Sequence, residues 1–354
     1  MRQTLLRIKL DQLWLFQTEE QILYVGVGFL LIPWVLFGLE SAVRHRNELS
    51  LTREHLPTLL FWLIPAAAIL AVPWSPAKSL ENGIPVYGYG FMLFVGFVVA
   101  GTVASRRARQ VGLNGDLVWD LGMWFFFSGV AGARLFYICQ YPERVFGGKE
   151  GIDLLIAAVN LPDGGLVFYG GILSVVAFFV FCRVKKLNLL LMGDIVMPSI
   201  FIGLGFGRIG CFFNGCCYGD VCHLPWAATF PQGSVPFLAL VNRGYLSADA
   251  LGSLPLHPTQ IYSSLNGFLL AALTGIYFRY RHRDGAVLAM GMLLYPVTRF
   301  MIEVLRFDEP GRLTISQWVS IGLFCCGMVF TIWLTWNAKR GTPSASLPNV
   351  EMAS

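Results

Sequence analysis

Apolar residues in this chain gather into long runs that short polar segments separate. A helix needs about 20 largely apolar residues to cross the hydrocarbon core of a bilayer. By this criterion the pattern predicts about nine transmembrane helices. They lie near residues 22–39, 56–74, 86–104, 117–138, 166–182, 195–212, 259–277, 286–305 and 315–336. The fold class that follows is an all-α polytopic membrane protein.

The sequence between and around these runs indicates three regions. Residues 1–20 carry six charged side chains, too many for a cleavable signal peptide, and are predicted to form a short interfacial helix. The first two transmembrane helices complete an amino-terminal extension over residues 1–80. Residues 81–338 form a membrane core with the other seven helices and outward-facing loops. Residues 339–354, which contain several Pro and Ser, form a disordered cytoplasmic tail.

Composition supports the membrane assignment and excludes other classes of protein. Charged residues make up 13% of the chain and hydrophobic residues 55%, whereas soluble domains carry roughly 25% charged residues. The net charge of +5 is not gathered into a basic tract. Nucleic acid is therefore not an expected partner.

The distribution of basic residues predicts the orientation of the core. Clusters of Lys and Arg follow every second helix, and the positive-inside bias places these ends in the cytoplasm. The clusters are Arg106, Arg107 and Arg109; Arg183, Lys185 and Lys186; Arg279, Arg281 and Arg283; and Lys339 and Arg340. The loops over residues 139–165, 213–257 and 306–314 then face outward.

Arg208 is the most informative residue of the chain. It ends an apolar run, in a segment that reads Gly-Leu-Gly-Phe-Gly-Arg-Ile-Gly over residues 203–210. An ionised side chain there costs on the order of a few kcal/mol unless it is paired or hydrated, and Arg cannot escape by losing its proton. Its planar set of donors suits a phosphate oxyanion. The alternative is a snorkelling Arg that only marks a helix end.

Other charged residues fall at the same predicted depth. Arg134 and Arg299 lie near the outer ends of their helices, so that with Arg208 they would form a positive basin at the level of the lipid headgroups. Arg299 and Glu303 are spaced i, i+4, and Tyr295 precedes Arg299 by one turn, so the three share one helix face. Within a membrane such charges face a cavity or a partner.

Several segments that combine glycines with polar residues resemble, in this order, the prolipoprotein diacylglyceryl transferase family. They are residues 87–90, 132–137, 163–171, 205–219, 257–262 and 295–306. The most specific is 205–219, which is similar to the family signature Gly-Arg-x-Gly-x-Phe-x-Asn-Gly. The resemblance runs from about residue 87 to residue 336. It implies transfer of the diacylglyceryl group of phosphatidylglycerol to the lipobox cysteine thiol of a prolipoprotein, with release of glycerol phosphate.

The resemblance also implies where the protein acts and with which residues. It implies the bacterial cytoplasmic (inner) membrane, an active site toward the outer face, and no cofactor. The expected partners are phosphatidylglycerol and prolipoprotein signal peptides. The catalytic candidates are Arg208, Arg299, Tyr89, Tyr169, Tyr295 and Glu303, and the substrate-binding candidates are Arg208, Asn214, Arg134, Arg306 and His257.

Two departures from the family pattern bear on the chemistry. Many members have a histidine, a candidate base, where this chain has Tyr169. A phenol with an ordinary pKa of about 10 is a poor base at neutral pH. Cys211 and Cys216 stand where an asparagine and an acidic residue are expected.

Soft ligands gather just beyond the signature. They are Cys211, Cys216, Cys217, Cys222 and His223. Disulfides or structural packing are favoured, because the predicted outward position is oxidising. Unpaired packing and a zinc site stay open as alternatives, and no metal is assigned to the candidate site.

Two other functions fit parts of the same pattern. A related transferase with a different acceptor is suggested by the cysteine and Tyr169 departures and by the additional amino-terminal helices. A non-catalytic phospholipid-binding or transport protein could use the same basic cavity, but a transporter should carry charge near the middle of the membrane. Here the charges gather at one face, which favours interfacial chemistry. His257 is expected to cap a helix start, with proton transfer as a secondary role.

Overall fold

The computed structural model describes residues 4–9, 16–19, 22–26, 84–148, 151–159, 170–306 and 313–339. The chain divides into two compact units, Met1–Met92 and Leu93–Ser354. The first holds a small sheet and the second holds the bundle of helices.

The first unit contains a four-stranded sheet with the order β2-β3-β1-β4. The strands are β1 (Thr4–Lys9), β2 (Phe16–Glu19), β3 (Ile22–Gly26) and β4 (Ile84–Tyr87). β1 pairs in parallel with β3 and antiparallel with β4, and β2 pairs antiparallel with β3.

The predicted interfacial helix over residues 1–20 is wrong, because β1 and β2 occupy this segment. The first predicted transmembrane helix is also wrong at its start, where residues 22–26 form β3. β3 is rich in β-branched and aromatic residues (Ile22, Tyr24 and Val25), which favour a pleated backbone. The pairing of β1 with residues 84–87 is a long-range contact that periodicity does not reveal. The rest of the two amino-terminal spans lies outside the described residues, as do the predicted tail beyond residue 339 and Tyr169.

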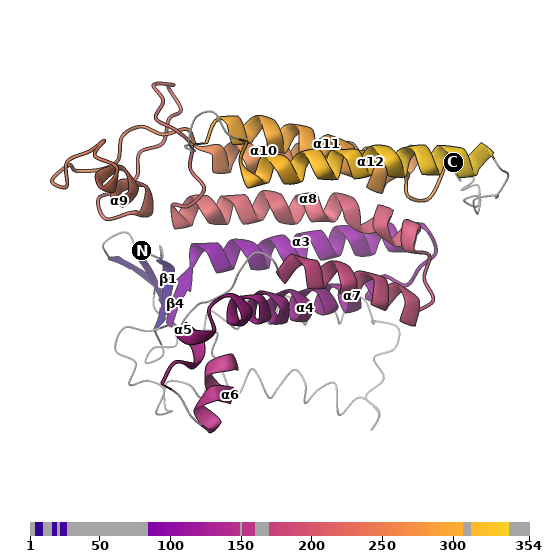
Figure 1. Ribbon diagram of the computed structural model, residues 1–354, viewed down its shortest axis with the longest axis horizontal. Helices are drawn as coiled ribbons and strands as arrows, with labels where there is room; N and C mark the ends of the chain where they lie inside the picture. Colours follow the sequence, from indigo (N-terminus) through magenta and orange to yellow (C-terminus); the bar gives the residue numbers. More distant parts are fainter. Residues whose placement is uncertain are drawn as a thin grey trace. The chain divides into compact units, whose positions relative to one another are not determined.

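Helices make up the membrane core (Figure 1). They are α3 (Gly88–Gln110), α4 (Asp116–Gln140), α5 (Pro142–Phe146), α6 (Ile152–Val159), α7 (Gly170–Val184), α8 (Leu189–Asn214), α9 (Val235–Asn242), α10 (Thr259–Tyr280), α11 (Ala286–Val304) and α12 (Ile315–Lys339). Six of those in the described ranges, α3, α4, α8, α10, α11 and α12, are long and apolar enough to cross a membrane, and α7 is a shorter apolar helix.

The prediction of an all-α polytopic membrane class is confirmed, and each of the seven predicted core spans coincides with one helix. Sequence analysis did not predict the short helices α5, α6 and α9, which lie in the segments expected to be loops. They are too short to show a clear helical period, and their formation depends on contacts with the bundle.

Helix α8 is the central element of the bundle. It contacts α10, α11 and α7, while α4 packs on α7 and α11 packs on α12 (Figure 1). Gly205 of α8 and Gly267 of α10 form the close crossing: a Cβ on Gly267 would lie 3.0 Å from the Gly205 nitrogen, and one on Gly205 would lie 2.6 Å from the Phe268 ring. Small residues permit such approach between membrane helices. Part of the glycine-rich segment around Arg208 therefore serves helix packing.

A buried ion pair holds the opposite end of α8. Asp194 is fully buried and accepts hydrogen bonds from the backbone N–H groups of Gly285 (2.8 Å) and Leu288 (2.9 Å). Arg281 Nε lies 3.5 Å from the same carboxylate. The carboxylate thus caps the amino terminus of α11, where the helix dipole favours negative charge.

Candidate active site

The carboxyl-terminal end of α11 gathers two arginines around one carboxylate. Glu303 Oε2 lies 2.6 Å from Arg299 Nη1, one turn earlier, and 3.4 Å from Arg306 Nη1, just past the helix end. The Glu303 side chain is 4% exposed, whereas those of Arg299 and Arg306 are 12% and 28% exposed. The predicted pairing of Arg299 with Glu303 on one helix face is confirmed, and Arg306 is a second partner that sequence analysis had placed only as a binding candidate.

The start of α12 completes the environment of this carboxylate. Thr314 Oγ1 donates a hydrogen bond to Glu303 Oε1 at 3.3 Å. The backbone N–H of Thr314 donates in turn to Gln317 Oε1 at 2.9 Å. Both carboxylate oxygens therefore have partners, so Glu303 is fixed in place and in turn fixes the two guanidinium groups.

Backbone hydrogen bonds join the loop after α8 to the ends of two other helices. We call the contact of Gly219 and Asp220 with His257 and Leu305 the clasp. Gly219 N–H donates to the His257 carbonyl before α10, and Asp220 N–H donates to the Leu305 carbonyl after α11. Gly219 also forms an isolated bridge with Arg306. A Cβ at Gly219 would lie 2.5 Å from the Leu305 oxygen and 2.7 Å from His257 Cβ. Only glycine fits this position, and its fit joins the ends of α8, α10 and α11.

The clasp brings Arg208 into the same region as Arg306. Arg208 is in the last two turns of α8, and its positive charge and that of Arg306 both act on the sulfur of Cys217. Within the part of the chain that the structure describes, no carboxylate forms an ion pair with Arg208. Among the described residues, Glu303 is the carboxylate that pairs with arginines of this group, and Arg208 adds a further positive charge that can bind an anion.

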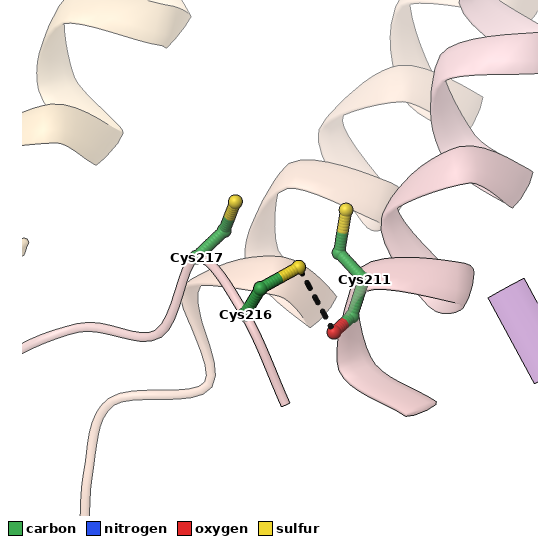
Figure 2. Close-up of side chains that lie close together, drawn as sticks. All are labelled: Cys211, Cys216 and Cys217. Carbon is green, nitrogen blue, oxygen red and sulfur yellow. Dashed lines mark hydrogen bonds between the residues drawn. The ribbon is translucent and has the colours of Figure 1, made fainter. Parts of the chain in front are cut away.

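Three cysteines lie close together at the end of α8 and just after it (Figure 2). The sulfur atoms of Cys211, Cys216 and Cys217 lie within 4.8 Å of one another, and the Cys216 thiol is directed at the Cys211 carbonyl oxygen, 3.7 Å away. All are free thiols, so the favoured disulfide is not formed, and Cys222 is buried outside this group. The neighbouring thiols of Cys211 and Cys216 lower the pKa of the Cys217 thiol, and the charges of Arg208 and Arg306 lower it further, while burial acts in the opposite direction.

Two further predicted site residues, Asn214 and Tyr295, have different surroundings. Asn214 is the last residue of α8, and its side chain is near enough to the Cys216 thiol to affect the pKa of that thiol. The Tyr295 ring packs at 5.9 Å on that of Phe201 and belongs to the partly buried shell of the core. Both functional assignments stay predictions, and the contacts of Tyr295 indicate packing.

The other predicted residues have separate surroundings. Arg134 Nε donates to the Ala158 carbonyl at 2.9 Å, and its Nη2 donates to the Ala157 carbonyl at 2.5 Å, so it caps the end of α6. Tyr89 lies in the first turn of α3, within the first unit. The ring of His257 lies 3.4 Å (Nδ1 to Oη) from Tyr262, in keeping with the expected structural role at the start of α10.

An apolar cavity that sequence analysis missed adjoins the clasp. Its volume is about 710 Å³. It is lined by Phe212, Leu224, Trp226, Ala228, His257, Pro258, Ile261, Tyr262, Leu265 and Leu305. The lining comes from the end of α8, the loop after it, the start of α10 and the residue after α11, and hydropathy does not predict that these elements meet.

Comparison with known proteins identifies the family. Residues 77–333 match the family model of prolipoprotein diacylglyceryl transferase. A phosphatidylglycerol–prolipoprotein diacylglyceryl transferase of Clostridium tetani is 33% identical over 71% of this chain and 94% of its own length. Enzymes of the same name from Idiomarina loihiensis and Rhodopirellula baltica are 30% and 26% identical, over 82% and 79% of this chain and 100% and 79% of their own lengths. This chain therefore belongs to the prolipoprotein diacylglyceryl transferase family, as a multi-pass membrane transferase of lipoprotein biosynthesis.

Proposed function

We propose that this chain transfers the diacylglyceryl group of phosphatidylglycerol to the lipobox cysteine thiol of a prolipoprotein, releasing glycerol phosphate. The observation that carries the proposal is the pairing of Arg299 and Arg306 with the one carboxylate of Glu303, while Arg208 and Arg306 both act on the nearby Cys217 thiol. The relatives are named for phosphatidylglycerol and prolipoprotein. An anionic phospholipid suits a site whose positive charge exceeds its negative charge.

The arginines act on the departing phosphate. The acceptor sulfur attacks carbon 3 of the glycerol, a C–S bond forms, and the C–O bond to phosphate breaks with its electron pair on oxygen. Negative charge therefore grows on the phosphate in the transition state. Fixed donors in a partly dry site stabilise such charge without reorganising. Arg208 suits this role because no described carboxylate competes for its guanidinium group.

Glu303 acts as a positioning residue. It touches Arg299, Arg306 and Thr314 and is almost fully buried. Fixing two guanidinium groups in advance lowers the entropy lost when phosphate binds. Its carboxylate also offsets part of the free energy required to bury two cations.

The apolar cavity beside the clasp suits an acyl chain of the lipid. It has a volume of about 710 Å³, and Leu305, which lines it, immediately precedes Arg306 in the chain. A lipid with its headgroup at the arginines would bring apolar chains to this wall. The clusters of basic residues at the opposite ends of the helices support, as part of this proposal, an arginine site at the outer face of a bacterial cytoplasmic membrane.

The decisive experiment uses purified full-length protein in bilayer discs that contain labelled phosphatidylglycerol. A lipobox peptide is added, and its mass is followed against a matched peptide with serine in place of cysteine. We expect a gain of one diacylglyceryl group on the cysteine peptide alone. Tight lipid binding without any mass gain would instead favour the carrier function, and transfer to both peptides would indicate a different acceptor group.

A further inference from the structure

Cys211, Cys216 and Cys217 have no assigned role, and their arrangement has the form of an incomplete metal site. Their sulfur atoms lie within 4.8 Å of one another at the end of α8 (Figure 2). We propose that these three thiols bind one Zn²⁺ ion, and that the fourth coordination position takes the thiol of the acceptor peptide. The second half of this inference rests on the proposed function.

The spacing of the sulfur atoms is close to what zinc requires. Zinc takes cysteine ligands at about 2.3 Å in tetrahedral geometry, which puts neighbouring sulfur atoms roughly 4 Å apart. Three thiols within 4.8 Å need only a small closure to reach that spacing. Sites with three protein ligands and one open position are typical of catalytic zinc, whereas four protein ligands are typical of structural zinc.

The backbone that carries two of the thiols is fixed in advance. Gln260 Nε2 donates to the Cys216 carbonyl at 2.8 Å, and Thr259 Oγ1 donates to the Cys217 carbonyl at 2.7 Å. Both donors come from the first turn of α10 and are fully or almost fully buried. Cys217 has a positive φ of 60°, a conformation that side chains rarely adopt. The clasped loop thus holds Cys216 and Cys217 against Cys211 on α8.

Gln260 also offers an unused acceptor at this loop. Its Oε1 atom is buried and has no hydrogen-bond partner among the residues that the structure describes. Buried polar atoms normally have a partner, so such an atom calls for an explanation. A hydrogen-bond donor that enters the site together with the metal or the peptide would be the missing partner of Gln260 Oε1.

The charges around the thiols suit a thiolate-bound zinc. Three thiolates on Zn²⁺ carry a net charge of −1, and a fourth thiolate makes it −2. Arg208 and Arg306 are the cations that act on Cys217, and both are positive at any working pH. They offset the charge of the zinc–thiolate group on one side and bind phosphate on the other. The sulfur nucleophile and the leaving phosphate would therefore lie next to each other.

The metal would ionise the acceptor thiol, a task for which this chain lacks the histidine that many family members have in place of Tyr169. A thiol that coordinates zinc loses its proton outright, here to solvent, so that no protein base is required. The zinc-bound sulfur then forms the C–S bond while the C–O bond to phosphate breaks. The product is a neutral thioether, a weaker ligand than a thiolate, so it leaves the metal. Cys211 and Cys216 replace an asparagine and an acidic residue of the family pattern, which is consistent with a changed route to the thiolate.

Metal binding tests the site without any substrate. Reduced full-length protein in detergent is stripped with a chelator, titrated with Co²⁺ and then with Zn²⁺, and analysed for metal content. We expect one metal ion per chain and a thiolate-to-cobalt charge-transfer band that zinc abolishes. Cys217→Ser and Cys216→Ser should lose the band, while the matched control Cys139→Ser, an exposed thiol outside the group, should keep it. Thermal unfolding of each variant shows that a lost band does not come from a lost fold.

Transfer to the lipobox peptide tests the open position. At neutral pH only a few per cent of free thiol is ionised, so zinc should raise the transfer rate on the order of 10-fold, and Zn²⁺ should restore the rate of stripped enzyme. Reduced protein that binds no metal, or that re-forms a disulfide among the three cysteines, overturns the site. Bound zinc whose removal leaves transfer unchanged overturns the role of the open position. Zinc binding with no transfer under any condition counts against the proposed function and leaves the metal site standing.

Discussion

The two ends of α8 use the same kinds of charged group for different purposes. At one end the single carboxylate of Asp194 meets one guanidinium, Arg281, and two backbone N–H groups, and both side chains are buried. At the other end the single carboxylate of Glu303 meets Arg299 and Arg306, with Arg208 close by. The first group is matched in charge and closed. The second has more cations than anions and is partly exposed.

This difference separates a structural group from a binding group. A buried ion pair whose charges match requires no water or ligand to compensate it, and removing one partner leaves an uncompensated charge. Excess positive charge at the edge of a membrane is expensive unless water or an anion compensates it. The excess, rather than the presence of charge, marks the candidate active site.

The largest effect on stability should come from breaking the matched end. Asp194→Asn leaves Arg281 buried without a carboxylate and weakens the cap of α11, so we expect a loss of about 3–5 kcal/mol of unfolding free energy. Thermal unfolding in detergent measures it. Asp120→Asn is the control, because Asp120 pairs with Lys185 at 3.6 Å on the surface and should lose at most about 1 kcal/mol. Equal losses in the two variants would remove the distinction between the ends.

The largest effect on catalysis should come from the other end. Arg208→Lys keeps the positive charge but loses the planar set of donors. We expect kcat/KM to fall by roughly 10²- to 10³-fold, the effect of losing one donor to a developing oxyanion, with an unchanged Tm. Arg183→Lys, on the exposed end of α7, is the matched control. Full turnover by Arg208→Lys at normal protein level would contradict the phosphate assignment.

The pair at Glu303 should separate folding from function. Glu303→Gln leaves Arg299 and Arg306 without their carboxylate, so both stability and transfer should fall. Adding Arg299→Gln should restore insertion and expression because it removes one uncompensated cation. This double variant should bind phosphatidylglycerol weakly and transfer nothing. Measurable transfer would assign the pair to structure alone and leave Arg208 as the main candidate.

A smaller effect should follow from opening the clasp. The Cβ of Gly219→Ala would lie 2.5 Å from the Leu305 oxygen, and neither backbone can move freely. We expect a loss of about 1–3 kcal/mol, typical of overpacking, and lower transfer because Arg306 shifts with Leu305. Gly203→Ala is the control, because its Cβ meets nothing within 4 Å. Its helix should tolerate alanine or gain about 1 kcal/mol. Similar Tm values for the two variants would show that the clasp is loose.

Hydropathy was sufficient for the core helices because each crossing segment must satisfy its own backbone hydrogen bonds. The ion pair of Arg299 and Glu303 could also be predicted, since an i, i+4 spacing fixes a shared face. The sheet could not, because β1 pairs with β4 across more than seventy residues of chain. Asp194 was missed although a lone carboxylate in an apolar run is a recognisable signal.

The contacts of individual arginines and cysteines could not be predicted from the sequence and are known only from the three-dimensional structure. The predicted depth of Arg134 in the membrane does not reveal that the carbonyls of Ala157 and Ala158 accept its hydrogen bonds. The closeness of Cys217 to Cys211 depends on Gly215, whose φ of 68° turns the chain back at the end of α8. The contacts of Arg134 and the closeness of the two cysteines both depend on the path of a loop, and the periodicity of the sequence does not predict that path.

The sharing of Glu303 has a consequence for repeated turnover. Arg299 and Arg306 approach the same oxygen, Oε2, at 2.6 Å and 3.4 Å, so two cations compete for one anion. In the proposed mechanism, a phosphate that binds one guanidinium leaves the fixed carboxylate paired with the other, and after the phosphate departs the carboxylate pairs with both. Neither cation is left bare at any stage. In the proposed mechanism Glu303 thus takes the place of the product's phosphate in the empty site, which favours the release of glycerol phosphate.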